Sequence, residues 1–375
     1  MTTTAAVRPG TPEEAAAALA DLSASGTAVR PAGTGSRAAW GGPDPAGTVT
    51  LHTGGLDRLV AHNPGDFTAV VQAGVPLAVL QRRLAAEGQW LALDPPDRGG
   101  TIGGLVATGD SGPARHRYGG VRDLVIGITV VLSDGTVARS GGTVIKNVAG
   151  YDLGKLFAGS YGTLGLIAQV ALRLHPLPAR TATAVGATDD PARLTAAVLA
   201  AARRPLEATA LDVAWRAGTG RLLVRFGGVT APERAAAAAP LLAGAGLADV
   251  AVVRDDESIW AAQRAGQRGA AVVKVSALPT DLPAVVAAAG DATVVSRAAL
   301  GVSWLAFPDG PDLAARVATA RAALAPRPTV VLDGADRVAD PWPAPAPGVR
   351  ALMERVKRRF DPTGTFRPGT YVGGI

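Results

Sequence analysis

The residues best suited to chemistry gather first in a short bend, Pro31-Ala32-Gly33-Thr34-Gly35-Ser36, which follows a segment typical of a β-strand at residues 27–30. Its side chains are small, so consecutive backbone N–H groups stay accessible. Such a nest of N–H groups suits a phosphate or pyrophosphate. The bend therefore predicts a site for a phosphorylated ligand.

The same glycines, in the spacing Gly33-x-Gly35-x-x-Ala38, also fit the fingerprint of Rossmann dinucleotide-binding folds, and Asp57 lies at a plausible distance for a ribose-binding acid. A Rossmann loop opens directly into a helix. Here the segment WGGPDP at residues 40–45 interrupts any helix, and the next expected element is a strand at residues 48–52. The pattern therefore disfavours a Rossmann fold.

A second chemical segment, GGTIGGLVATGDSGPARHRYGG, spans residues 99–120. Because it is so rich in glycine, we expect a long loop without regular structure that lies close to a ligand. It contains His116 between Arg115 and Arg117. Histidine suits a proton acceptor and arginine suits a carboxylate partner. The other histidines all precede residue 176: His52, His62 and His175.

The composition excludes several classes of protein. The 375 residues include no cysteine, which rules out disulfides, cysteine-ligated iron–sulfur clusters and a thioether link to a cofactor. The net charge of +6 is scattered, with no basic run interleaved with aromatic residues, so we expect no nucleic-acid partner. No stretch approaches the roughly 18 apolar residues of a membrane span. We expect a cytoplasmic protein without direct membrane insertion.

Local signals predict the elements that must position these residues. A capping box with proline predicts a helix at residues 11–25, and Asp134-Gly135 predicts a hairpin of strands at 125–132 and 137–140. From residue 179 the chain becomes alanine-rich, and its strands and helices follow the order βαββαβ twice. That order predicts a duplicated ferredoxin-like, antiparallel α+β unit.

Several motifs together resemble one family. They are RPAGTGS (30–36), PPDRGGTIGG (95–104), SGP (111–113), GGTVIKNVAGYDL (141–153), GSYGTLGLI (159–167) and FDPTGTFRPG (360–369). This set resembles the vanillyl-alcohol-oxidase-like flavoproteins, whose FAD-binding domain is of the PCMH type, and within them the FAD-binding subunits of glycolate oxidase. The resemblance is strong over residues 28–178 and returns in the last thirty residues.

The resemblance implies an α+β fold with a two-lobed PCMH-type FAD-binding domain and a ferredoxin-like α+β cap domain. The implied domains are 1–178, with lobes of about 1–95 and 96–178, then the cap at 179–345, and a C-terminal segment at 346–375 that returns to the FAD domain. It also implies FAD-binding residues: Pro31, Ala32, Gly33, Thr34, Gly35, Ser36, Thr101, Gly103, Gly104, Thr108, Ser111, Gly112, Lys146, Asn147, Gly165 and Ile167.

The candidate catalytic residues are His116, Arg117 and Tyr151. Larger relatives place catalytic or metal-binding histidines in the cap, and this cap has none, so we expect no metal site. Because the chain has no cysteine and its phosphate bend has no histidine, we expect FAD to be bound non-covalently.

The resemblance implies a subunit that oxidises a small 2-hydroxyacid, glycolate or D-lactate, and passes electrons to a second flavoprotein subunit and an iron–sulfur subunit. These partner subunits are also the route by which a cytoplasmic chain of this kind would associate with a membrane. Two alternatives stay open. One is a stand-alone flavin oxidase or dehydrogenase for another hydroxyacid, alditol or lactone. The other is a non-catalytic flavin-bearing scaffold or electron relay.

Overall fold

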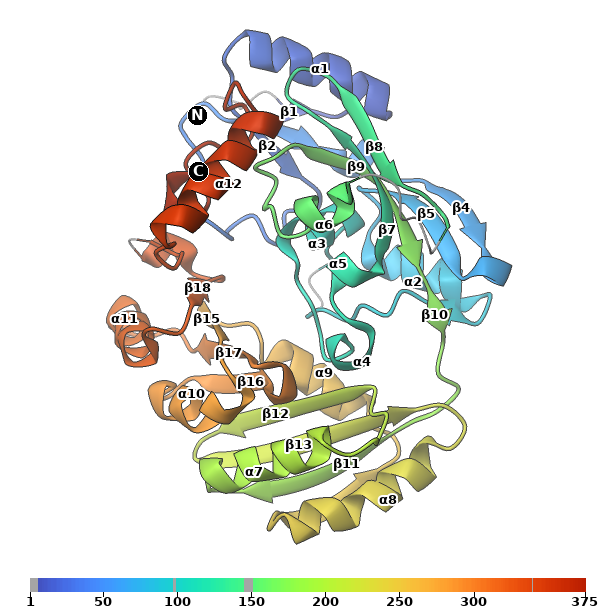
Figure 1. The fold of residues 1–375 in the computed structure, drawn as a ribbon, viewed down its shortest axis with the longest axis vertical. Helices are drawn as coiled ribbons and strands as arrows, with labels where there is room; N and C mark the ends of the chain where they lie inside the picture. Colours follow the sequence, from blue (N-terminus) through green and yellow to red (C-terminus); the bar gives the residue numbers. More distant parts are fainter. Residues whose placement is uncertain (1–5, 97–98, 145–150, 339) are drawn as a thin grey trace.

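The chain folds into two units, as the computed structural model in Figure 1 shows. The structure describes residues 6–96, 99–144, 151–338 and 340–375. We call the first half, together with the last helix, the N-terminal unit, and the part built on one large sheet the eight-stranded unit. The chain passes from the N-terminal unit to the eight-stranded unit after β10 and returns after β18.

The N-terminal unit contains two main sheets. A small parallel sheet has the order β1-β3-β2, and an antiparallel sheet has the order β4-β5-β9-β7-β8. The five-stranded sheet joins strands from both sides of residue 95 in the sequence. The strands are β1 (Ala6–Val7), β2 (Val29–Ala32), β3 (Val49–His52), β4 (Leu59–Asn63), β5 (Thr68–Gln72), β7 (Val125–Val131), β8 (Val137–Gly141) and β9 (Leu166–Arg173), with a separate pair of β6 (Gln89–Trp90) and β10 (His175–Pro176).

Helices cover both faces of the five-stranded sheet. Apolar residues of α2 and α3 pack on one face, while α1 and the small parallel sheet pack on the other. Helix α1 begins as the sequence predicts, because the Thr11 hydroxyl accepts a hydrogen bond from the N–H of Glu14. The helices are α1 (Pro12–Ala24), α2 (Leu77–Ala85), α3 (Ile102–Thr108), α4 (Arg115–Tyr118), α5 (Val121–Leu124) and α6 (Leu153–Phe157).

The eight-stranded unit confirms the predicted duplication. Its antiparallel sheet has the order β14-β11-β13-β12-β16-β17-β15-β18, so two βαββαβ halves join edge to edge through β12 and β16. The strands are β11 (Thr181–Thr188), β12 (Ala210–Arg216), β13 (Thr219–Gly227), β14 (Ala248–Val253), β15 (Ala271–Ser276), β16 (Thr293–Arg297), β17 (Val302–Phe307) and β18 (Thr329–Val331).

Its two faces have different partners. Helices α7 (Pro191–Ala202), α8 (Ala231–Gly244), α10 (Leu282–Ala288) and α11 (Leu313–Leu324) cover the outer face. Helix α9 (Glu257–Ala265) and residues of the N-terminal unit, Trp40 among them, cover the inner face. The inner face is therefore the place where a ligand would meet both units.

The last segment returns to the N-terminal unit. Helix α12 (Pro347–Phe360) lies beside the blue N-terminal strands in Figure 1, with both chain ends nearby. Phe366 forms a parallel bridge with Val29 of β2, and the Lys357 ammonium group donates to the carbonyls of Thr163 and Phe366. The chain thus closes its first sheet with residues from its far end.

One sequence expectation about the fold is wrong. Residues 99–120 are not a loop without regular structure, because α3 and α4 form within them. Gly103 lies inside α3, where an added Cβ would be 2.6 Å from the Cβ of Ala73. The glycine is there for close packing of the helix, which outweighs its low helix propensity.

Among the described residues, no helix has the length and apolar character that a membrane crossing demands.

Candidate functional site

The predicted phosphate bend leaves its N–H groups available. It follows β2, and no hydrogen bond within the described residues uses the N–H of Thr34, Gly35 or Ser36. Gly35 has a positive φ of 77°, with no atom within 4 Å of the place where a Cβ would stand. At Gly33 an added Cβ would lie 2.2 Å from the Thr101 hydroxyl oxygen. The bend is therefore a main-chain cradle closed on one side by Thr101.

This bend forms one wall of a cleft that we call the loop cleft. Its other walls are α3, the start of β9 and Arg367. Twelve of the residues expected from the sequence line it: Pro31, Ala32, Gly33, Thr34, Gly35, Ser36, Thr101, Gly103, Gly104, Thr108, Gly165 and Ile167. Sequence reasoning did not single out Arg30, Tyr161 or Arg367, which also line it. Arg367 comes from the far end of the chain, so no local signal could have placed it there.

Two of the described residues that we expected to bind the cofactor do not line the loop cleft. Ser111 and Gly112 lie between the two units, where their carbonyls accept hydrogen bonds from the buried Arg297. The Ser111 carbonyl also accepts from Gln267. Lys146 and Asn147 fall outside the described residues.

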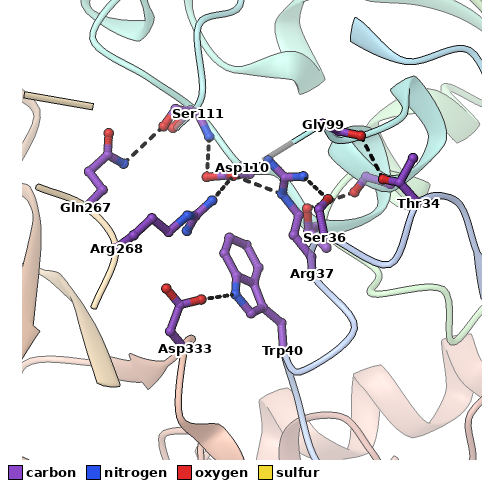
Figure 2. A network of polar contacts seen from close by, with 12 residues as sticks. Thr34, Ser36, Arg37, Trp40, Gly99, Asp110, Ser111, Gln267, Arg268 and Asp333 are labelled. Atoms are coloured by element: carbon purple, nitrogen blue, oxygen red, sulfur yellow. Dashed lines mark hydrogen bonds and ion pairs between the residues drawn. The ribbon is translucent and has the colours of Figure 1, made fainter. Parts of the chain in front are cut away.

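A buried polar network runs from the phosphate bend to the eight-stranded unit (Figure 2). The carboxylate of Asp110 accepts from Arg37 Nε at 2.9 Å and from Arg37 NH2 and Arg268 NH2, both at 2.6 Å. Burial alone would raise the pKa of Asp110, but the guanidinium groups of Arg268 and Arg37 outweigh it and hold that pKa below its usual value. Arg37 also donates to the Ser36 hydroxyl at 2.8 Å.

Trp40 extends the network to the eight-stranded unit. Its indole N–H donates to Asp333 at 3.0 Å, and the guanidinium of Arg268 lies 4.7 Å from its ring centre. Trp40 is 2% exposed. The residues that follow the phosphate bend are therefore fixed against the eight-stranded unit.

A second cleft, which we call the inter-unit cleft, opens between the two units. Arg37 lines both clefts, and Gly100 of the inter-unit cleft directly precedes Thr101 of the loop cleft. Asp94, Trp90 and Tyr118 line it on the side of the N-terminal unit. Arg225, Glu257 and Arg264 line the opposite wall.

Asp94 is a titratable group that lines this cleft on the side of the N-terminal unit. Burial raises its pKa to about 6, although the N–H of Ala114 and the charges of Arg297 and Arg264 lower it in part. A carboxyl with such a pKa changes charge close to neutral pH. The sequence shows Asp94 only as the residue before two prolines, and its role was not anticipated.

The three candidate catalytic residues are not brought together. His116 and Arg117 of α4 line a separate hollow beside the end of α7. Tyr151 is 93% exposed. None of the three lines the loop cleft or the inter-unit cleft.

Comparison with known proteins identifies the class of the N-terminal unit. Residues 3–141 match the family described as FAD binding domain. This match includes the phosphate bend and α3, and the open main-chain cradle fits the pyrophosphate of FAD. Residues 3–141 are therefore similar to this family of FAD binding domains, and the match supports FAD as the cofactor.

Several curated relatives are named for the oxidation of hydroxyacids. The chain is 39% identical over 150 residues to the glycolate oxidase subunit GlcE of Escherichia coli (strain K12), covering 39% of this chain and 42% of that protein. It is 38% identical over 141 residues to the mitochondrial D-lactate dehydrogenase [cytochrome] of Arabidopsis thaliana, covering 38% and 25%. It is 33% identical over 175 residues to the glycolate oxidase subunit GlcD of Bacillus subtilis (strain 168), covering 46% and 37%. Each match spans less than half of the relative's length.

The fold extends the likeness over nearly the whole chain. A solved structure of alkyldihydroxyacetonephosphate synthase superposes with a TM-score of 0.71 over 96% of this chain and 75% of that one, at 15% identity. At that identity the likeness concerns the fold alone. The α+β class, with an FAD binding domain and an eight-stranded unit, is confirmed.

Proposed function

We propose that this protein binds FAD non-covalently in the loop cleft and oxidises a small 2-hydroxyacid, of the glycolate or D-lactate kind, to the 2-oxoacid. The observation that carries the proposal is the loop cleft, whose wall has free N–H groups at residues 34–36 and small residues where a ligand must approach closely. The names of the relatives support the substrate class.

The residues of the chain have distinct parts in this proposal. The N–H groups of Thr34, Gly35 and Ser36 meet the pyrophosphate charge, and α3 with the segment 165–167 borders the remainder of the cofactor. The bound flavin supplies a two-electron oxidant for a carbon that bears a hydroxyl. Arg37 lines both clefts, so we expect the cofactor and the substrate to come together next to Arg37.

The proposal includes the domain division and the partners. Residues 1–178 with 346–375 form the FAD-binding domain, and 179–345 form the cap. The hydrogen bonds from Lys357 to Thr163 and Phe366 support the return of the last segment. Electrons leave through a second flavoprotein subunit and an iron–sulfur subunit in the cytoplasm, a proposal supported by two relatives named as glycolate oxidase subunits.

The first experiment tests the cofactor site. Gly35→Ala places a side chain at a positive φ in the cradle, and we expect FAD affinity to fall by about tenfold or more. Gly290→Ala is the matched control, because Gly290 also has a positive φ (59°) with no atom within 4 Å of an added Cβ. Equal FAD affinity in the two variants would contradict the assignment of the cradle. Acid treatment should release the flavin from the wild-type chain.

The second experiment tests activity and partners. The protein should be purified from native extract with its flavin and iron content measured, and glycolate and D-lactate should then be added without oxygen. Bleaching of the flavin together with co-purified iron supports a catalytic subunit of a complex. Bleaching without partners favours the stand-alone enzyme, and a flavin that no hydroxyacid bleaches favours the scaffold.

A further inference from the structure

The inter-unit cleft is a second site that the binding of FAD alone does not explain. Its floor comes from the N-terminal unit and its wall from β13 and α9 of the eight-stranded unit. It contains side chains of both charges and shares Arg37 with the loop cleft. A concave site between units with converging polar groups is the ordinary setting of a substrate pocket.

The carboxylate of Asp94 is held in place through one oxygen only. Its Oδ1 accepts the N–H of Ala114 at 2.9 Å. The other oxygen makes no hydrogen bond among the described residues, and the residue is partly exposed to the cleft. One oxygen therefore fixes the orientation of the carboxylate, and the other is available to a ligand.

The opposite wall offers guanidinium groups. Arg225 is committed to Asp256, with contacts of 2.9 and 3.1 Å to a carboxylate that is fully buried. Among the described residues, Arg264 pairs with Glu257, whose side chain is 68% exposed. An exposed carboxylate holds its partner weakly, so a ligand carboxylate can replace Glu257 at Arg264.

We propose that the inter-unit cleft binds the hydroxyacid substrate, with Arg264 holding its carboxylate and Asp94 accepting the proton of its hydroxyl group. This inference rests on the proposed function and adds residues to it. In the step, the O–H bond breaks and its proton goes to Asp94. The C–H bond breaks and its hydrogen leaves with both electrons to the oxidised flavin, so the product is the 2-oxoacid.

The electrostatics fit an acceptor of protons. Burial raises the pKa of Asp94 to about 6, so the carboxyl is mostly ionised at neutral pH and still basic enough to take a proton. The charged groups around it are Arg297 of β16, Arg264 of α9 and Asp212 of β12, and Tyr118 of α4 is a further titratable neighbour. The two arginines lower the pKa and Asp212 raises it.

The test uses the FAD-loaded protein and two pairs of variants. Asp94→Asn keeps an oxygen for the Ala114 N–H but removes the proton acceptor, and its control is Asp66→Asn at an exposed turn. Arg264→Gln removes the carboxylate partner, and its control is Arg203→Gln, exposed at the end of α7. Flavin content per chain shows whether each variant is folded.

Binding is measured first, by calorimetry with glycolate and with D-lactate on protein whose flavin has been reduced with dithionite, so that no turnover occurs. We expect the dissociation constant of the hydroxyacid to rise by about tenfold or more in Arg264→Gln. In Arg203→Gln it should equal that of wild type. In wild type the rate of flavin bleaching should rise as pH rises through about 6, because Asp94 accepts a proton only when it is ionised. Asp94→Asn should lose that step.

Flavin bleaching by the same hydroxyacid is measured second, without oxygen. We expect Asp94→Asn to slow it by about 10²–10⁴-fold, the usual contribution of a general base, and Asp66→Asn to leave it unchanged. Bleaching that is normal in both Asp94→Asn and Arg264→Gln overturns this inference and leaves the proposed function standing. Binding without bleaching in wild type overturns the proposed oxidation and the proton transfer to Asp94, and leaves only the binding role of Arg264. Absence of both overturns the two together.

Discussion

The buried carboxylate of Asp110 should be among the most costly side chains to alter in this protein. In Asp110→Asn, the guanidinium groups of Arg37 and Arg268 lose the anion that each contacts at 2.6 Å, and they then repel each other. Asp110 is 4% exposed, so water cannot replace the lost charge. Removing one partner of a buried ion pair costs about 3–5 kcal/mol, and we expect a loss of that size in the free energy of unfolding.

The assay is urea unfolding followed by tryptophan fluorescence at pH 7. The matched control is Asp309→Asn, because the pair of Asp309 with Arg337 is exposed and its loss should leave the midpoint unchanged. Arg268→Gln added to Asp110→Asn should recover part of the loss, since it removes one of the two facing cations. A midpoint in Asp110→Asn equal to that of Asp309→Asn would refute this reasoning.

The same carboxylate makes a prediction about pH. The pKa of Asp110 is held below its unfolded value of 3.8, so its stabilising contribution is present above pH 3.8 and is lost as pH falls through the lower folded value. The stability difference between wild type and Asp110→Asn should therefore shrink in strong acid. A constant difference between pH 7 and pH 3 would contradict this linkage.

Three further changes have defined outcomes. Gly33→Ala would bring a Cβ to 2.2 Å from the Thr101 hydroxyl oxygen, so purified protein should contain little FAD, which absorbance measures. Trp40→Phe removes a buried hydrogen bond of 3.0 Å to Asp333, and we expect the free energy of unfolding to fall by about 1–3 kcal/mol in urea titrations. Burial lowers the pKa of Lys274 to about 8 in the folded protein, from 10.5 in the unfolded chain. The charged ammonium group therefore lowers the free energy of unfolding most below pH 8, and this effect vanishes above pH 10.5. Lys274→Met should therefore stabilise the protein at pH 7 and have less effect at pH 11, as thermal unfolding would show.

The elements with local signals could be predicted from the sequence. The capping residue Thr11 starts α1, and Asp134-Gly135 joins β7 to β8. The double βαββαβ order also follows from local patterns, because each helix and strand has its own periodicity. The phosphate bend could be predicted because consecutive small residues after a strand leave their backbone N–H groups accessible to a ligand.

The features that depend on contacts between distant residues could not be predicted. Asp110 meets Arg37 and Arg268, which are 73 and 158 residues away in the sequence. The raised pKa of Asp94 depends on burial by both units, and nothing in the adjacent prolines indicates it. Helix α3 was missed for the same reason, since Gly103 is favoured by packing against Ala73 and not by helix propensity.

The bridge between Val29 and Phe366 has a consequence for biosynthesis. A ribosome makes β2 early and Phe366 only after the whole eight-stranded unit, so the first sheet waits with an open edge while the later unit folds. An unpaired edge is a place where nascent chains associate wrongly. The full chain should therefore depend on chaperones during translation more than either unit would if it were produced alone.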